Sequence, residues 1–315
     1  MEKKLIVSAS PHMRSGATTQ KLMLDVIIAL APAAVASVII FGPQALLLIA
    51  VSVASCVLCE YICRRVMKRE NTIFDLSAVV TGLLLAFNLP AGLNPLIAVF
   101  GAMAAIIVVK QMFGGIGQNF VNPALTARII LMTSFPAKMT TWPAPFAYMN
   151  GADAVTTATP LALSAQGAQD SLPSYLEMFL GARGGCLGET CTLALLLGGV
   201  YLVARRVISP VIPLCYLGTA AVFSLCLGRD VLFDLMAGGL MLGAIFMATD
   251  YTTSPITTKG KVIYGIGCGV LTMLIRVFAS LPEGVSFSIV LMNIMVPLIE
   301  RVSRPKPFGK EPAKP

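Results

Sequence analysis

The sequence of 315 residues has few charged side chains, which make up 12% of the chain, and a single histidine. A soluble domain carries about 25% charged residues, so this composition excludes an ordinary soluble protein. The first 21 residues are polar and lack an apolar core followed by small residues, so we expect no cleaved signal peptide. The one histidine, His12, lies in this polar stretch, where we expect it to be solvated.

Metal and nucleotide motifs are also scarce. Cys56, Cys59 and Cys63 share one face of an apolar segment, but no histidine or carboxylate pattern accompanies them, which favours packing over a metal site. Cys186 and Cys191 flank the start of another segment and could pair, and the sequence leaves this open. The chain has no glycine motif for nucleotides after a strand, and no cysteine cluster suited to an iron–sulfur centre.

Long apolar runs dominate the sequence, in which 57% of residues are hydrophobic. Runs of about 17 to 25 apolar residues are typical of transmembrane helices. The pattern therefore predicts an all-α polytopic protein of the cell (inner) membrane. Ten apolar segments are predicted, at residues 22–41, 44–63, 74–89, 95–112, 121–135, 190–206, 210–228, 231–248, 261–280 and 285–303.

The basic residues are distributed unevenly between the two sets of connections. Eighteen of the 23 lie in the terminal regions and in one set of loops and flanks, whereas the opposite loops hold only Lys138, Arg183 and Arg229. The positive-inside rule then places both termini in the cytoplasm and the long connection 136–189 outside it. The net charge of +8 thus reflects membrane orientation, and we expect no nucleic-acid partner.

Two of the segments resemble each other. "FDLSAVVTGLLLAFN" (74–88) and "FDLMAGGLMLGAIFM" (233–247) begin with the same three residues and lie five spans apart. An odd separation gives the copies opposite orientations, which is the pattern of an inverted repeat with sites near the middle of the membrane. We therefore predict an N-terminal tail with a first five-helix repeat (1–135), an extracytoplasmic loop (136–189), a second five-helix repeat (190–303) and a cytoplasmic tail (304–315).

Asp75 and Asp234 occupy matched positions in the two copies. Ionisable groups in a membrane are costly and often functional, so these carboxylates are candidates for an ion path. The alternative is that each caps a helix N-terminus, where aspartate is favoured. The fifth segment, within "GGIGQNFVNPALTARII" (114–130), is short, which fits either a half-helix that faces a cavity or an ordinary short helix.

A polar, threonine-rich stretch, "GADAVTTATPLALS" (151–164), lies in the long connection. Its residue chemistry alone fits a plain surface loop. It also matches a motif of aspartate, two residues, serine or threonine, a small residue, alanine and threonine, which here runs from Asp153 through Thr156 and Ala158 to Thr159. In this motif the chain resembles the family of the D subunit of the Rnf ion-translocating electron-transport complex, related to the B subunit of the sodium-translocating NADH:quinone reductase.

The resemblance implies that Thr159 carries FMN through a phosphoester bond. The threonine is then an anchor for the cofactor, so no catalytic residue and no metal ligand are expected on this chain. Thr157 departs from the motif, which usually has glycine at this position. A second match, "SGAT" at 15–18, has no aspartate at position 12, and the charges place it in the cytoplasm, whereas the flavin transferase of this family resembles an enzyme that acts outside. Attachment is therefore predicted at Thr159 and not at Thr18.

The resemblance extends over nearly the whole chain, through "SPHMRSGATTQKLMLDVIIALAPA" (10–33), "FGGIGQNFVNPALTAR" (113–128) and "MATDYTTSPITTKGKVIYG" (247–265). It implies ten helices in two inverted halves, similar to urea transporters. Only about 21 residues precede the first apolar segment, and this short start favours the Rnf branch over the quinone reductase, whose subunit generally has a longer extension.

The resemblance also implies a function. The chain would be the flavoprotein subunit of an ion-translocating ferredoxin:NAD oxidoreductase, inactive alone, which relays electrons and couples them to Na⁺ or H⁺ transport. Its partners would be the A, B, C, E and G subunits of the Rnf complex and a flavin transferase, with ferredoxin and NAD bound by other subunits. A noncovalent riboflavin is a further expected cofactor. The alternatives are the quinone-reductase subunit and a urea or small-solute channel, and a channel gives no reason for the threonine motif.

Overall fold

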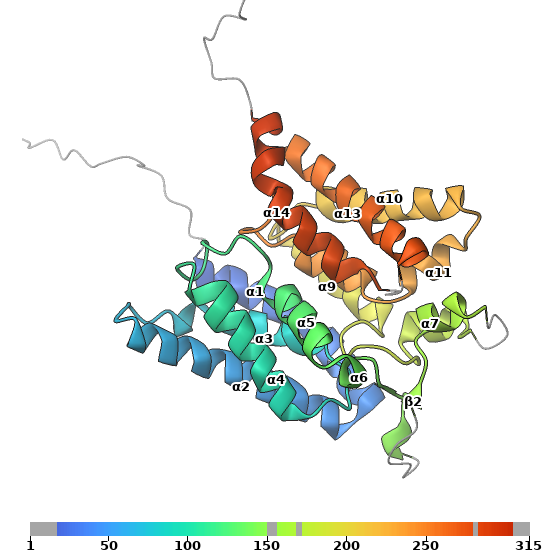
Figure 1. Ribbon diagram of the computed structural model, residues 1–315, viewed down its shortest axis with the longest axis horizontal. Helices are drawn as coiled ribbons and strands as arrows, with labels where there is room; N and C mark the ends of the chain where they lie inside the picture. Colours follow the sequence, from blue (N-terminus) through green and yellow to red (C-terminus); the bar gives the residue numbers. More distant parts are fainter. Residues whose placement is uncertain (1–17, 150–155, 168–171, 280–282, 305–315) are drawn as a thin grey trace, which may run out of the picture.

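The structure is a computed structural model that describes residues 18–149, 156–167, 172–279 and 283–304. Most of the described chain is helical, and its helices form two groups that lie against each other, one from each half of the sequence (Figure 1). The first group comprises α1 (Thr19–Phe41), α2 (Pro43–Val66), α3 (Ser77–Phe87), α4 (Pro95–Met103), its π-helical continuation η2 (Ala104–Gln111) and α5 (Pro123–Ser134). The second comprises α9 (Thr192–Ala204), α10 (Val211–Cys226), α11 (Val231–Met236), α12 (Leu240–Leu242), the π-helical η5 (Gly243–Met247), α13 (Thr258–Phe278) and α14 (Val285–Ser303).

Local sequence signals explain where several helices begin. Asn94 and Asn122 cap α4 and α5 through side-chain oxygens that accept backbone N–H groups, and a proline follows each at the first helical position. Gly42 separates α1 from α2 with a φ of 75°, and a Cβ atom there would lie 2.6 Å from the ring of Tyr148. This turn therefore requires glycine for both its backbone conformation and its close packing.

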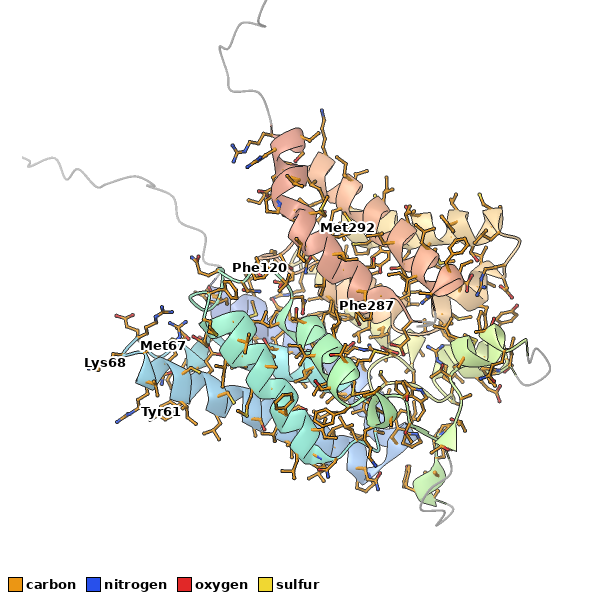
Figure 2. The ribbon with its side chains drawn as sticks, viewed as in Figure 1. Tyr61, Met67, Lys68, Phe120, Phe287 and Met292 are labelled. Carbon is orange, nitrogen blue, oxygen red and sulfur yellow. The ribbon has the colours of Figure 1, made fainter. Side chains whose placement is uncertain are left out.

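Among the described residues, four helices are long and apolar enough to cross a membrane, namely α1, α2, α13 and α14. Shorter apolar helices accompany them, and each of the ten apolar segments predicted from the sequence contains a described helix. Large apolar side chains remain exposed on the outer faces, as membrane lipid would require, and the end of α2 points Tyr61, Met67 and Lys68 away from the bundle (Figure 2). The chain is thus a mostly helical, multi-pass membrane protein.

The structure corrects the extent of two predicted segments. Segment three begins with a short 3-10 helix, η1 (Ile73–Asp75), and its α-helix starts only at Ser77, because Leu76 between them adopts the left-handed backbone region with a φ of 62°. Segment eight is interrupted, since Ala237 is extended and Gly238 has a φ of 60°, so α11 and α12 are separate helices. The fifth helix, α5, has 12 residues and a length of about 18 Å, well short of a hydrocarbon core of about 30 Å.

The long connection between the two groups also contains regular structure. Its elements are α6 (Pro136–Met139), β1 (Trp142–Pro143), η3 (Ala147–Met149), β2 (Thr156–Thr157), α7 (Pro160–Ala165) and α8 (Tyr175–Leu180). β1 and β2 pair antiparallel, with Trp142 opposite Thr157, and the other regular elements in the described part of the chain are helices. The N–H of Phe146 donates to the carbonyl of Ile40 at 2.8 Å, which fixes the connection to the end of α1.

The two groups share one hydrophobic core. α1 packs against α9, and α5 packs against α14, so each group contributes to the contact between them. The hydroxyl of Ser37 in α1 donates to the carbonyl of Leu187, just ahead of α9, at 2.5 Å. Leu30 and Leu195 are fully buried in this core. This packing brings the connection before α9 against the first group, where the candidate site lies.

Candidate functional site

Thr159 lies between β2 and α7 and is 8% exposed. Its Oγ1 accepts a hydrogen bond from the N–H of Ala162 at 3.2 Å, so the side chain caps α7. Thr156 is exposed on β2 opposite Pro143, and Ala158 is exposed beside it. Asp153, the first residue of the predicted motif, lies outside the described residues. The structure thus positions the predicted attachment threonine between a strand and a helix, and its carbonyl accepts the N–H of Leu163 in that helix at 3.0 Å.

A cavity of about 10 Å³ adjoins Thr159, which is room for about one water molecule. Arg183 and Thr190, from the turn between α8 and α9, line it together with the carboxylates of Glu189 and Glu283. Three of the seven buried side-chain polar atoms that have no partner among the described residues belong here: Thr157 Oγ1, Arg183 Nη1 and Thr190 Oγ1. Unpaired buried polar groups are costly, and such a concentration needs an explanation.

Arg183 is 5% exposed, and its side chain is held by backbone carbonyls of the turn between α8 and α9. Its Nε donates to the carbonyl of Thr190 at 3.2 Å and its Nη2 to the carbonyl of Glu189 at 2.8 Å. Burial lowers the pKa of Arg183 to about 10, so the guanidinium is still charged at neutral pH. The sequence led us to count Arg183 as a loop charge on the outer side; the structure shows it buried.

A second guanidinium, that of Arg128 on α5, balances the two carboxylates. Arg128 Nη1 lies 2.7 Å from Glu189 Oε1 and 2.7 Å from Asn88 Oδ1, and its Nη2 pairs with Glu283. Both Arg128 and Glu189 are buried. A third guanidinium, Arg276 on α13, donates to the carbonyls of Asp234 at 2.6 Å and Ala237 at 2.9 Å. Together with Arg229 and Asp234, which pair with each other close to Arg276, four guanidinium groups and three carboxylates lie around this end of the bundle.

Cys186 completes the surroundings of these carboxylates. Its sulfur and the oxygens of Glu189 and Glu283 lie within 4.8 Å of one another, a separation that a metal ion could bridge. However, Arg128 already bridges both carboxylates. Burial raises the pKa of the Cys186 thiol, which keeps it protonated, and the thiol donates to the carbonyl of Asn88 at 3.3 Å. The arrangement is an ion-pair cluster, and Cys186 and Cys191 are both free thiols.

Asp75 and Asp234, the predicted ion-path residues, lie in different environments. Asp75 is partly exposed, and its Oδ1 accepts the N–H of Ser77 at 2.9 Å and the Ser77 hydroxyl at 2.6 Å, as a residue that begins a helix does. Asp234 is buried in the first turn of α11. Its carboxylate pairs with Arg229 at 2.9 Å and accepts the Ser224 hydroxyl at 2.6 Å. The structure does not bring the two carboxylates together.

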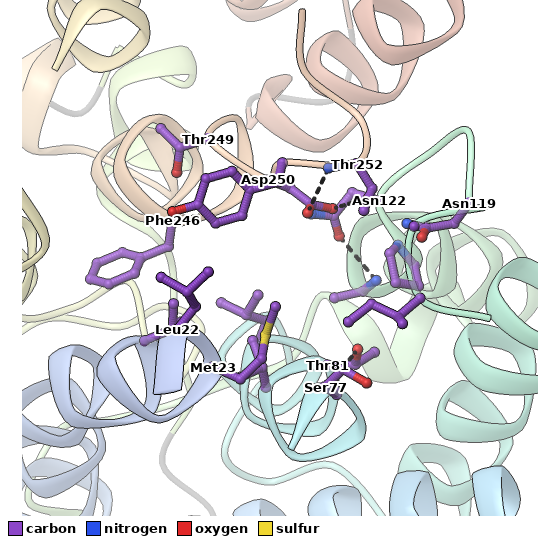
Figure 3. Close-up of a pocket in the computed structure, with 18 of the residues that line it drawn as sticks. Leu22, Met23, Ser77, Thr81, Asn119, Asn122, Phe246, Thr249, Asp250 and Thr252 are labelled. Carbon is purple, nitrogen blue, oxygen red and sulfur yellow. Dashed lines mark hydrogen bonds between the residues drawn. The ribbon is translucent and has the colours of Figure 1, made fainter. Parts of the chain in front are cut away.

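Sequence reasoning missed a larger cavity at the opposite end of α5, with a volume of about 460 Å³ (Figure 3). Leu22 and Met23 of α1 and Phe246 of η5 form apolar walls. Asn122, which caps α5, lies at its edge and donates through Nδ2 to the carbonyl of Met247 at 3.3 Å. The start of α5 thus faces a cavity, as the half-helix interpretation of segment five requires.

Charged side chains line the same cavity. Lys110 of η2 is buried, and its Nζ lies 2.8 Å from Glu60 and 2.6 Å from the Ser77 hydroxyl. Asp250, in the loop after η5, accepts the hydroxyl of Thr252 at 3.1 Å. Burial is the main cause that raises the pKa of Asp250. The asparagines and threonines of these stretches were a usable signal, since polar residues interrupt apolar segments here.

These features define a class: a helical membrane protein with a large internal cavity and a buried ionic cluster beside a threonine-bearing loop. The chain belongs to the NQR2, RnfD, RnfE family, whose model matches residues 6–309. The resemblance drawn from the sequence is thereby confirmed.

Several relatives match over nearly their whole length. The chain is 50% identical to the D subunit of the Na⁺-translocating ferredoxin:NAD⁺ oxidoreductase complex of Acetobacterium woodii, over 98% of this chain and 96% of that protein. It is 43% identical to the D subunit of the proton-translocating ferredoxin:NAD⁺ oxidoreductase complex of Clostridium ljungdahlii, over 96% of each chain. It is 40% identical to the D subunit of the ion-translocating oxidoreductase complex of Stutzerimonas stutzeri, over 93% of each chain.

Proposed function

We propose that this chain is the flavin-carrying membrane subunit of an ion-translocating ferredoxin:NAD oxidoreductase complex. The observation that carries the proposal is the position of Thr159 beside a buried, charged Arg183. The names of the relatives support the same activity. The chain would work with the A, B, C, E and G subunits of such a complex, and ferredoxin and NAD would bind those partners.

The residues around Thr159 fit a covalent FMN through its phosphate. The cavity beside the threonine presents a guanidinium N–H without a partner among the described residues, which is a donor suited to an anionic oxygen. A cavity of about 10 Å³ has room for about one water molecule, so the flavin ring would lie outside it and the phosphate would enter only after the lining side chains move apart. When bound, the ring would supply electron transfer, and the chain would hold its phosphate in place.

Attachment would need a separate flavin transferase, because the two carboxylates that line the cavity with Thr159, those of Glu189 and Glu283, are both paired with Arg128 and are therefore weak bases for its hydroxyl. The phosphorus of FAD that bears the riboflavin part would form a bond to Thr159 Oγ1. The anhydride bond between the two phosphates would break, AMP would leave, and the hydroxyl proton would pass to the enzyme's base. The threonine hydroxyl is buried and accepts the N–H of Ala162, so it must rotate out before the transferase can reach it.

The larger cavity fits a noncovalent riboflavin. Its volume of about 460 Å³ lies within the range of about 300–1,000 Å³ typical of small-molecule sites, and its walls are mainly apolar. Lys110 and Asn122 offer donors, and Asp250 offers acceptors, for the polar edge and ribityl chain of such a ligand. These side chains would orient the ligand, and Leu22 and Phe246 would exclude water.

The finer topology belongs to the same proposal. We infer ten spans in two inverted repeats, both termini in the cytoplasm and residues 136–189 outside, from the distribution of basic residues. Asp75 and Asp234 remain candidates for an Na⁺ or H⁺ path. The relatives are named for different ions, Na⁺ in one case and protons in another, so the coupling ion has to be measured.

The direct test is to purify the chain after co-expression with its flavin transferase and to separate it on a denaturing gel. Flavin fluorescence on the protein band, with a mass increase of FMN minus water, is the expected result. A non-fluorescent band of unmodified mass would overturn the proposal. A small-solute channel would then be the better-supported function, since a channel needs no flavin.

A further inference from the structure

Arg183 forms no ion pair with any described carboxylate, and the nearby Glu189, which attracts its charge, is paired with Arg128. Two of its three nitrogens bind the backbone carbonyls of Glu189 and Thr190, and Nη1 has no partner among the described residues. Arg128 already satisfies the nearby carboxylates of Glu189 and Glu283. A buried cation without an ionic partner is costly in a folded protein. The turn that contains Arg183 is therefore suited to bind an anion.

Two hydroxyls share this property. Thr190 Oγ1 and Thr157 Oγ1 are buried, and neither has a hydrogen-bond partner among the described residues. Thr190 lines the cavity beside Thr159, and Thr157 lies against Gly184, which lines the same cavity. A hydroxyl can always turn to donate to an acceptor, so both are ready donors. The cavity beside Thr159 therefore holds donors without partners, whereas its acceptors, the carboxylates of Glu189 and Glu283, are already paired with Arg128.

We propose that Arg183, Thr190 and Thr157 form a binding site for the phosphodiester that links the flavin to Thr159. This inference rests on the proposed function, since it needs FMN at that residue. A phosphodiester carries one negative charge and its free oxygens only accept hydrogen bonds, which matches one guanidinium and two hydroxyls. The charges agree, because the four arginines 128, 183, 229 and 276 exceed the three carboxylates of Glu189, Asp234 and Glu283 by one.

The site gives each residue a distinct role. Arg183 is a positioning residue: it would bind the phosphodiester and so restrict the orientations that the flavin ring can adopt. It would not contact the reacting atoms of the ring. Thr157 stands where the family motif usually has glycine, so its hydroxyl is a donor that a glycine would not supply. A Cβ atom at Gly184 would collide with Thr157 Oγ1, so glycine at 184 leaves room for this donor.

The test uses the full-length flavinylated chain and compares Arg183→Gln, Arg183→Lys and Thr190→Val with wild type. Intact mass establishes whether Thr159 still carries FMN. Quenching of flavin fluorescence by neutral acrylamide, together with decay of its anisotropy, then measures how freely the bound flavin moves. A neutral quencher is necessary because removal of a cation would itself change the approach of iodide. Ser52→Ala is the matched control, since Ser52 also has a buried hydroxyl without a described partner, but on α2.

We expect FMN on all variants, with a more mobile flavin in Arg183→Gln and Thr190→Val. The ratio of docked to undocked flavin should fall roughly ten-fold or more in Arg183→Gln, because a hydrogen bond from a charged donor contributes about that factor. Arg183→Lys should lie between it and wild type, and Ser52→Ala should match wild type. Thr190→Val should fold normally, because the Thr190 hydroxyl has no hydrogen bond among the described residues that the substitution could remove. If Arg183→Gln fails to fold, flavin mobility in Thr190→Val is therefore the test of the binding site.

Flavin mobility equal to wild type in a flavinylated Thr190→Val and in every folded Arg183 variant would overturn the binding site while leaving the proposed function intact. A wild-type chain without FMN would instead refute the proposed function itself. The two failures are therefore distinguishable in one set of samples.

Discussion

Replacement of Arg128 by glutamine should destabilise the chain far more than loss of an exposed arginine. Arg128 is buried and pairs with Glu189 at 2.7 Å and with Glu283. Loss of one partner from a buried ion pair costs about 3–5 kcal/mol, because the remaining charge is stranded. Arg205 is the control: its side chain is 59% exposed and lies 3.4 Å from Asp25, and such a pair contributes about 0–1 kcal/mol.

The assay is denaturant unfolding of the purified chain in detergent, followed by tryptophan fluorescence. Trp142 is the only tryptophan and is 8% exposed in β1, so its emission reports the loop that lies next to this cluster. A triple variant with glutamine at 128, 189 and 283 should recover much of the lost stability, since no charge is then stranded. An Arg128→Gln chain as stable as Arg205→Gln would refute the reasoning.

Three further outcomes are expected. Thr159→Val should abolish covalent flavin, as measured by intact mass, and Thr18→Val should leave it unchanged; flavin that follows Thr18 would contradict both the site and the orientation. A cysteine at Ser164, with the native cysteines removed, should react with an impermeant thiol reagent on intact cells, and labelling only after lysis would reverse the topology. If Asp75 and Asp234 serve the ion path, their asparagine variants should assemble and carry FMN but transport fewer ions per electron in proteoliposomes. Normal ion transport per electron in both asparagine variants would remove the two aspartates from the ion path and leave them only a structural role.

The apolar segments were predictable because their signal is local. Each of the ten contains a described helix, since the length of an apolar run and its bounding glycine or proline are visible in the sequence. The break between α11 and α12 was missed, although "AGG" at 237–239 marks it, because the apolar pattern continues across it. Apolar periodicity reports burial and does not report a change of direction within a buried segment.

The surroundings of the site were less predictable. Thr159 was identified from a motif, but the burial of Arg183 depends on how the turn before α9 packs, which no local pattern records. The larger cavity draws its lining from α1, α3, α5, η2 and the loop after η5. Such a cavity exists only after the two halves have packed. Lys110 illustrates the same limit, since its partner Glu60 lies fifty residues away.

The Arg128 cluster also constrains how the two halves can move. It joins α5 of the first half to Glu189, just ahead of α9, and to Glu283, just ahead of α14. A rocking motion that parted the halves here would leave charges without partners in a medium of low dielectric. At the other end of α5 the halves are joined by weaker contacts, namely the hydrogen bond from Asn122 to the carbonyl of Met247 at 3.3 Å and the exposed ion pair of Arg205 with Asp25 at 3.4 Å. Separation of the two halves would therefore cost more beside the threonine loop than at the large cavity, where the contacts are exposed or uncharged.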